Sequence, residues 1–171
     1  MRRFLEPWFA TEVFSFAKDA QRQKAEQKFL TRLEAGKAQH AIGVYPAADA
    51  ASRAFYVLTL RPEADSTQVL PGISALQREL DVVLLHQGIL EPALGITARA
   101  VASESNLTYE REAATALAAV DRGDAQAAFL LNPVDVDLVM RVATAGEVMP
   151  QKSTDFYPKL LSGITMYRVA E

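Results

Sequence analysis

The stretch that decides the fold is a pair of strand-forming runs, His40-Ala-Ile-Gly-Val-Tyr45 and Ala54-Phe-Tyr-Val-Leu-Thr-Leu60. Both runs are rich in β-branched and aromatic residues, and a small, polar segment separates them. We therefore predict a β-hairpin. Pro62 closes its second strand because proline cannot donate a ladder hydrogen bond.

A helix is predicted before the hairpin. Ala25, Phe29 and Leu33 recur at intervals of four residues, which places them on one face of a helix. Asp19 is the predicted cap at the start of this helix, and Gly36 suits its end. Upstream of the cap, the apolar run over 12–16 is predicted to be a short strand, whereas Trp8 and Phe9 before it could equally be helical.

Downstream of the hairpin, the pattern alternates between apolar runs and turn signals. We predict, in order, a loop over 61–71, a buried helical stretch over 74–94 interrupted at Gly88 and Pro92, a connection over 97–105, a short strand over 106–109, a helix over 110–121, a central strand over 127–131, a helix over 134–145 that Asn132-Pro133 opens, and a closing strand over 163–169. Because helices do not alternate strictly with single strands, we predict an α+β fold, with a mixed, largely antiparallel sheet covered by helices.

The composition limits the classes of function. The chain has 171 residues, a net charge of -3 and no cysteine. Its length fits a single domain over 1–171. The net charge argues against a nucleic-acid partner, and no apolar run reaches the ~18 residues that a membrane span needs. The lack of cysteine excludes disulfides and thiolate metal sites and fits a reducing compartment, so we predict a cytoplasmic protein.

The candidate site is the stretch 146–163, Gly-Glu-Val-Met-Pro-Gln-Lys-Ser-Thr-Asp-Phe-Tyr-Pro-Lys-Leu-Leu-Ser-Gly. Pro150 and Pro158 prevent a helix from running through it. A fixed loop here would present ammonium, hydroxyl and backbone N–H groups toward a phosphate. The residues that would bind are Lys152, Ser153, Thr154, Tyr157 and Lys159, with His86 as a further member. Alternatively, Lys152 pairs with Asp155 and the hydroxyls satisfy the backbone of a turn.

The motifs Met149-Pro-Gln-Lys-Ser-Thr154 and Phe156-Tyr-Pro-Lys-Leu-Leu-Ser-Gly163 resemble the end of a bacterial and archaeal domain-of-unknown-function family, number ten-fifteen. Leu80-Asp-Val-Val-Leu-Leu-His86 and Ala127-Ala-Phe-Leu-Leu-Asn-Pro133 are similar to two of its upstream motifs. The resemblance covers most of residues 36–165. It implies that this chain corresponds to the C-terminal half of a longer architecture, whose first half carries a Gly-His-His-Arg element. Asp155 stands where the family's signature has an aromatic residue.

Other sites are less favoured by the sequence. In an α-helix His86 and Glu91 would lie on different faces, so we predict no metal site. The N–H groups that follow Asn132 could face an anion, but Asp135 and Asp137 already complement that helix end. Tyr45, Tyr56, Tyr109 and Tyr157 could line a pocket, but tyrosine is common on half-buried strands, so packing is the default account.

Two functions fit these observations. The first is binding of a phosphate-bearing small molecule, as part of a small-metabolite phosphotransferase. The second is a non-catalytic structural or dimerisation module, which forms a homodimer and binds no ligand. The sequence identifies neither a cofactor nor a nucleophile with its base, so it leaves open whether the protein is an enzyme.

Overall fold

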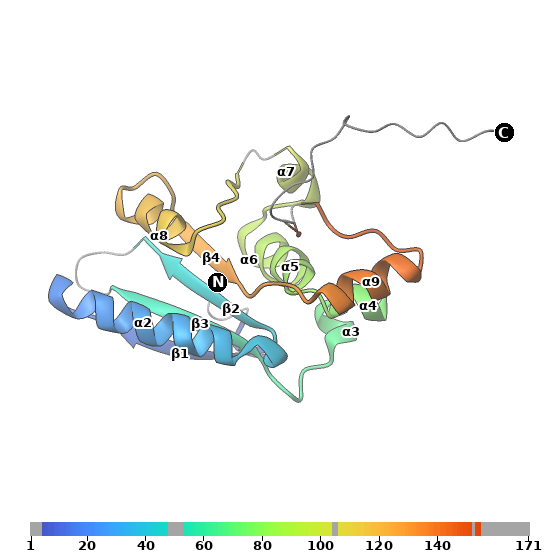
Figure 1. Ribbon diagram of the computed structural model, residues 1–171, viewed down its shortest axis with the longest axis horizontal. Helices are drawn as coiled ribbons and strands as arrows, with labels where there is room; N and C mark the ends of the chain where they lie inside the picture. Colours follow the sequence, from blue (N-terminus) through green and yellow to red (C-terminus); the bar gives the residue numbers. More distant parts are fainter. Residues whose placement is uncertain (1–4, 48–52, 104–105, 152, 155–171) are drawn as a thin grey trace.

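The computed structural model describes residues 5–47, 53–103, 106–151 and 153–154, and it confirms the α+β class. A four-stranded sheet with helices on one face forms one half of the molecule, and a group of short helices against the other face forms the second half (Figure 1). Every strand pairing in these ranges is antiparallel. The predictions for Lys152, Asp155, Tyr157 and Lys159 and for the strand over 163–169 lie outside the described residues.

The sheet contains the predicted hairpin at its centre. In chain order the strands are β1 (Phe9–Ser15), β2 (Ala41–Pro46), β3 (Ala54–Leu60) and β4 (Ala127–Leu131). Their order across the sheet is β1-β3-β2-β4. In the hairpin Ile42 lies opposite Leu58, and on its other side Ile42 lies opposite Leu131. The first strand was predicted over 12–16, but it begins at Phe9, which is buried.

The predicted central strand, β4, occupies an end of this sheet instead. Its apolar run reflects the burial of its two faces and not pairing at both of its edges. Ala128 and Leu130 pack into the core on one face, and Phe129 and Leu131 contact the core on the other. Within the described ranges, β4 pairs with β2 alone.

One face of the sheet is covered by α2 (Asp19–Ala35) together with α8 (Ala113–Asp121). The predicted stripe of Ala25, Phe29 and Leu33 is buried against the sheet. The ring of Phe29 is 0% exposed and stacks on Phe55, with ring centroids 5.1 Å apart. This aromatic contact anchors α2 to β3.

The ends of α2 differ in detail from the prediction. The N-cap is Lys18, and Asp19 is the first helical residue, whose carboxylate accepts a hydrogen bond from Arg53 at 2.6 Å. Gly36 ends the helix as predicted, but in a right-handed conformation with φ of -88°. A Cβ at this position would lie 2.6 Å from the Cβ of Ala41, so close approach of the next strand requires the glycine.

The other face of the sheet is covered by the helical stretch after the hairpin. Its elements are α3 (Ser66–Val69), α4 (Ala75–Arg78), α5 (Asp81–Val83), the π-helix η2 (Leu84–Leu90) and α6 (Glu91–Leu94). The predicted loop over 61–71 therefore contains a short helix. The interruption falls between α4 and α5, whereas α5, η2 and α6 follow one another directly through Gly88 and Pro92. The wide π turn ends just before Pro92, whose nitrogen has no hydrogen to donate.

The remaining helices are α7 (Ala98–Ala102), α8 and α9 (Val136–Thr144). The structure of this part of the chain corrects three predictions. The predicted connection over 97–105 contains α7, which the Thr97 hydroxyl caps at the backbone N–H of Ala100. Residues 106–109 form no strand. Asp135 is the N-cap of α9, and Asn132 instead donates its side-chain amide to the carbonyl of Leu33 at 2.9 Å.

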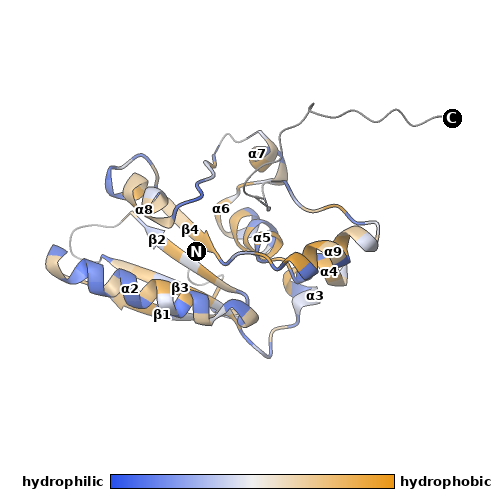
Figure 2. Cartoon of the chain, in the orientation of Figure 1, coloured by the Kyte–Doolittle hydropathy of each residue, from blue (hydrophilic) through white to orange (hydrophobic). Residues whose placement is uncertain are grey.

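Hydropathy distinguishes the surface helix α2 from the strand β4. In Figure 2, α2 carries hydrophilic and hydrophobic stretches side by side, whereas β4 is hydrophobic along its length. In the part of the chain that the structure describes, no helix combines the length and the apolar character that a bilayer crossing requires.

Candidate functional site

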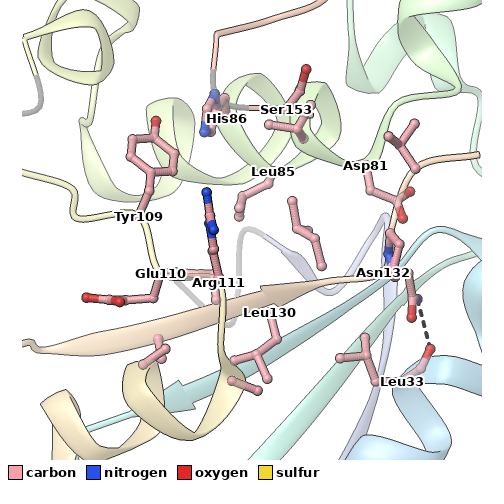
Figure 3. Close-up of a pocket in the computed structure, with 18 of the residues that line it drawn as sticks. Leu33, Asp81, Leu85, His86, Tyr109, Glu110, Arg111, Leu130, Asn132 and Ser153 are labelled. Carbon is pink, nitrogen blue, oxygen red and sulfur yellow. Dashed lines mark hydrogen bonds between the residues drawn. The ribbon is translucent and has the colours of Figure 1, made fainter. Parts of the chain in front are cut away.

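A cavity of about 1110 Å³ lies beside β4. Its walls include β4 with the turn that follows it, the helix made by α5 and η2, the segment 107–113 that leads into α8, and the end of α2 with the residues up to His40. The helix runs along one side and β4 along the opposite side (Figure 3). Segments that are far apart in the sequence therefore converge on one space.

The helix wall contributes His86 beside the buried Leu85. Burial lowers the pKa of His86 below its ordinary value, because the imidazolium loses hydration there. At neutral pH the ring is therefore uncharged, with one N–H donor and one acceptor nitrogen. Within the described ranges, no three His, Cys, Asp or Glu side chains gather to hold a metal ion.

The segment opposite η2 supplies Tyr109 and Arg111. Both side chains extend toward the helix that carries His86, while Glu110 between them points away (Figure 3). A guanidinium group is suited to planar, two-point recognition of a phosphate or carboxylate. Sequence reasoning missed Arg111, because this residue lies between two glutamates in a segment whose charge is typical of a solvated loop. Its position just before the start of α8 is the one signal that could have found it.

Ser153 brings the predicted C-terminal loop to the same cavity. Its hydroxyl donates to the carbonyl of Pro150 at 2.6 Å, and its backbone N–H donates to the same carbonyl at 3.3 Å. This is the arrangement expected of hydroxyls that satisfy a turn. The structure therefore brings together His86 and Ser153 of the predicted site. Thr154 is half-buried but does not line the cavity.

The other end of the cavity contains a histidine–carboxylate pair. His40 donates its Nδ1–H to the Asp81 carboxylate at 2.8 Å. This hydrogen bond raises the pKa of His40, and partial burial opposes the rise. The backbone of His40 is left-handed, with φ of 52°, a conformation that residues other than glycine seldom adopt. The pair joins the start of β2 to the start of α5 and so ties the two halves together.

Most carboxylates of the lining have a cationic partner. Besides the Asp81–His40 pair, Lys37 contacts Asp135 at 2.6 Å. Arg141 binds Glu79 through two hydrogen bonds of 2.7 and 2.8 Å, which hold the pKa of Glu79 below its ordinary value. These pairs offset the acidic groups, so an anion in the cavity meets less repulsion than the sequence charge suggests.

Tyrosine was predicted either to pack in the core or to line a pocket, and two tyrosines differ in this respect. Tyr45 is buried in the core, stacks on Phe55 at 4.6 Å and donates its hydroxyl to Asp121 at 2.8 Å. Burial raises the pKa of Tyr45, and the hydrogen bond to Asp121 adds to the rise. Tyr109 instead lines the cavity. Packing is therefore the role of Tyr45, and Tyr109 is a candidate ligand-contacting residue.

The His40–Asp81 pair leads to a prediction about stability and pH. The folded-state pKa of His40 is raised, so its stabilising contribution is fully present below about pH 6.5 and is lost as pH rises through the folded-state value. His40→Asn removes the titrating group and keeps a residue that tolerates the left-handed backbone. We expect the variant to be less stable by about 1.5 kcal/mol below pH 6.5, because a hydrogen bond to a charged group is lost.

Urea unfolding of both proteins between pH 5.5 and 8.5 measures this difference. His86 has a lowered pKa and acts in the opposite direction, but it is present in both proteins and cancels. A difference in unfolding free energy that does not change with pH would contradict a charged pair.

The chain was compared with protein-family models, with curated proteins and with solved structures, and none of the three comparisons found a match. The resemblance to the family stays a prediction, and the proposals below rest on the geometry of the cavity.

Proposed function

We propose that this protein binds a phosphate-bearing small molecule in the cavity between η2 and β4. The observation that carries the proposal is the convergence of His86 and Ser153, both predicted from the sequence, with Arg111 around one space. The Arg111 guanidinium would bind the phosphate oxygens, and the neutral His86 ring and the Tyr109 hydroxyl would each donate one hydrogen bond.

The apolar walls of the cavity suit the organic part of such a molecule. Leu85 lines the helix side and Leu130 lines the β4 side. Ligand sites typically combine apolar walls with a few placed polar groups, and their volumes reach roughly 1,000 Å³. Lys152 and Lys159, which lie close to Ser153 in the sequence, would add positive charge. We also propose a cytoplasmic location, on the basis of the cysteine-free sequence.

Calorimetric titration with inorganic phosphate and with ATP tests the proposal. Arg111→Gln should weaken binding by about tenfold, because a charge-assisted, two-point contact becomes neutral. Arg99→Gln is the matched control, since Arg99 is an exposed arginine on α7 that does not line the cavity. Equal affinities for the wild type and Arg111→Gln, or no binding by the wild type, would contradict the proposal and favour the structural module.

The protonation of His86 predicts how binding depends on pH. Sulfate is the suitable probe because it keeps two negative charges across the range. A bound dianion stabilises the imidazolium, so the affinity for sulfate should rise as pH falls below about 6.5. His86→Gln should abolish this rise, whereas His40→Asn, at the other end of the cavity, should preserve most of it. The measurement is the dissociation constant between pH 5.5 and 8. A wild-type affinity that does not change with pH would exclude His86 from the site.

A further inference from the structure

The end of the cavity away from Arg111 contains hydrogen-bonding groups that the proposed phosphate site does not use. In Figure 3, Asp81 and Asn132 lie to one side of Leu85, and Tyr109 and Arg111 lie to the other. The cavity holds about 1110 Å³, which is far more than a single phosphate group fills. A ligand whose phosphate is bound at Arg111 therefore has room to extend along the apolar walls to this second polar end.

Three side chains at this end are each held by a hydrogen bond and keep a further polar atom for a ligand. They are His40, Asp81 and Asn132, and all three line the cavity. The 2.8 Å bond between His40 and Asp81 uses one ring nitrogen and one carboxylate oxygen. Within the described residues, Nε2 of His40 and the second oxygen of Asp81 have no other hydrogen-bond partner. The amide of Asn132 donates one N–H to Leu33, which leaves its carbonyl oxygen and its second N–H.

The charges at this end decide what kind of group fits there. Asp81, Glu79 and Asp135 each contact a cationic side chain of the protein. Glu34 also lines the cavity, but it is exposed, so solvent screens its charge. A ligand cation thus finds little uncompensated negative charge. A hydroxyl group is neutral and both donates and accepts hydrogen bonds, so it matches a surface that combines carboxylate, amide and imidazole groups.

We propose that this end binds hydroxyl groups in the organic part of the ligand, and that the ligand is a sugar phosphate or polyol phosphate. The inference rests on the proposed function, because the phosphate has to be bound at Arg111. A ligand hydroxyl donates to the Asp81 carboxylate, which is a charge-assisted bond, and another accepts from the Asn132 amide. Nε2 of His40 accepts from a hydroxyl when the ring is neutral and donates to one when the ring is charged.

The same groups make the site selective against apolar chains. The side chain of Asp81 is only 15% exposed, so a bound ligand readily removes its remaining water. An alkyl chain at this end would displace that water without replacing its hydrogen bonds, and an unpaired polar group is costly. We therefore expect an alkyl phosphate to bind about tenfold more weakly than a polyol phosphate of the same chain length.

Calorimetric titration with three six-carbon phosphate monoesters tests the inference. They are sorbitol 6-phosphate, hexyl phosphate and 6-aminohexyl phosphate, in a buffer free of phosphate and sulfate. The wild type should bind sorbitol 6-phosphate about tenfold more tightly than hexyl phosphate. Asp81→Asn and His40→Asn should each reduce this preference, measured as the ratio of the two dissociation constants. Arg111→Gln is the matched variant at the phosphate end, and it should weaken the binding of both ligands while the preference persists.

The outcomes separate this inference from the proposed function. Equal binding of sorbitol 6-phosphate and hexyl phosphate, both weakened in Arg111→Gln, would overturn the hydroxyl site and leave the phosphate site standing. A preference that both Asp81→Asn and His40→Asn retain would also overturn it, and so would tightest binding of 6-aminohexyl phosphate, which would identify a cation site. No binding of any monoester would contradict both proposals. The wild-type comparison decides the matter even if a variant fails to fold, which urea unfolding would reveal.

Discussion

Phe29→Ala should destabilise the protein by about 3–5 kcal/mol, the range measured for large-to-small changes at buried aromatic residues. Phe29 is 0% exposed and lies within 5.1 Å of Phe55 and 6.4 Å of Phe14 between ring centroids. Its removal leaves a cavity where α2 contacts the sheet. Because small domains are stable by only about 5–15 kcal/mol, this one change would remove much of the total.

Urea and thermal unfolding measure this effect. A loss of this size corresponds to a decrease in melting temperature of roughly 6–20 °C in a chain of this length. Phe14→Ala is the matched control, because Phe14 is half-buried on the edge strand β1 and meets Phe29 edge-on. A smaller loss for Phe29→Ala than for Phe14→Ala would show that α2 is not anchored by this contact.

Gly43→Val should have the second large effect, a decrease of about 3 kcal/mol in the free energy of unfolding. Overpacking of a core costs about 1–3 kcal/mol and occasionally more. Gly43 lies in the middle of β2 under α2. A Cβ at this position would stand 2.7 Å from the Phe29 Cζ and 3.1 Å from the Leu33 Cδ2. The Phe29 ring cannot retreat, because it is stacked on Phe55. The glycine therefore allows the helix to approach the strand.

Unfolding by urea again provides the measurement, and the double variant Gly43→Val/Phe29→Leu sharpens it. The smaller leucine makes room for the valine, so the double variant should be more stable than the sum of the two single losses predicts. Strictly additive losses would mean that Gly43 and Phe29 do not compete for the same space.

The elements that local pattern determines were predictable from the sequence. The helical stripe through Ala25, Phe29 and Leu33 and the hairpin of β2 and β3 follow from side-chain periodicity, and the structure confirms them. The position of β4 was not predictable in the same way. An apolar run reports that both faces of a strand are buried, but it carries no information about which edges are paired.

Tertiary contacts explain the other differences. Asn132 looked like a helix cap, but its amide binds the carbonyl of Leu33 at the end of α2, a contact between residues 99 positions apart in the chain. Leu107 and Tyr109 looked like a short strand, because contact with the core or the cavity wall also requires apolar side chains. Local pattern cannot distinguish these cases.

The candidate site was predictable only in part. His86 and Ser153 were selected separately, and the structure places them around one cavity. Arg111 was missed because nothing in its neighbourhood distinguishes it from a surface residue. The spacing argument for His86 and Glu91 assumed an α-helix, whereas η2 has the wider turn of a π-helix, in which residues five apart are joined by hydrogen bonds.

The most direct test of the proposed binding site is a titration of isotope-labelled protein with inorganic phosphate, followed by backbone and arginine side-chain NMR signals. The account predicts saturable shifts that are largest at His86, Tyr109 and Arg111, and small shifts on the outer face of α2, which carries the exposed Lys24 and Lys28. Shifts that are equal on both surfaces and do not saturate, or no shifts at the three cavity residues, would contradict a phosphate site in this cavity.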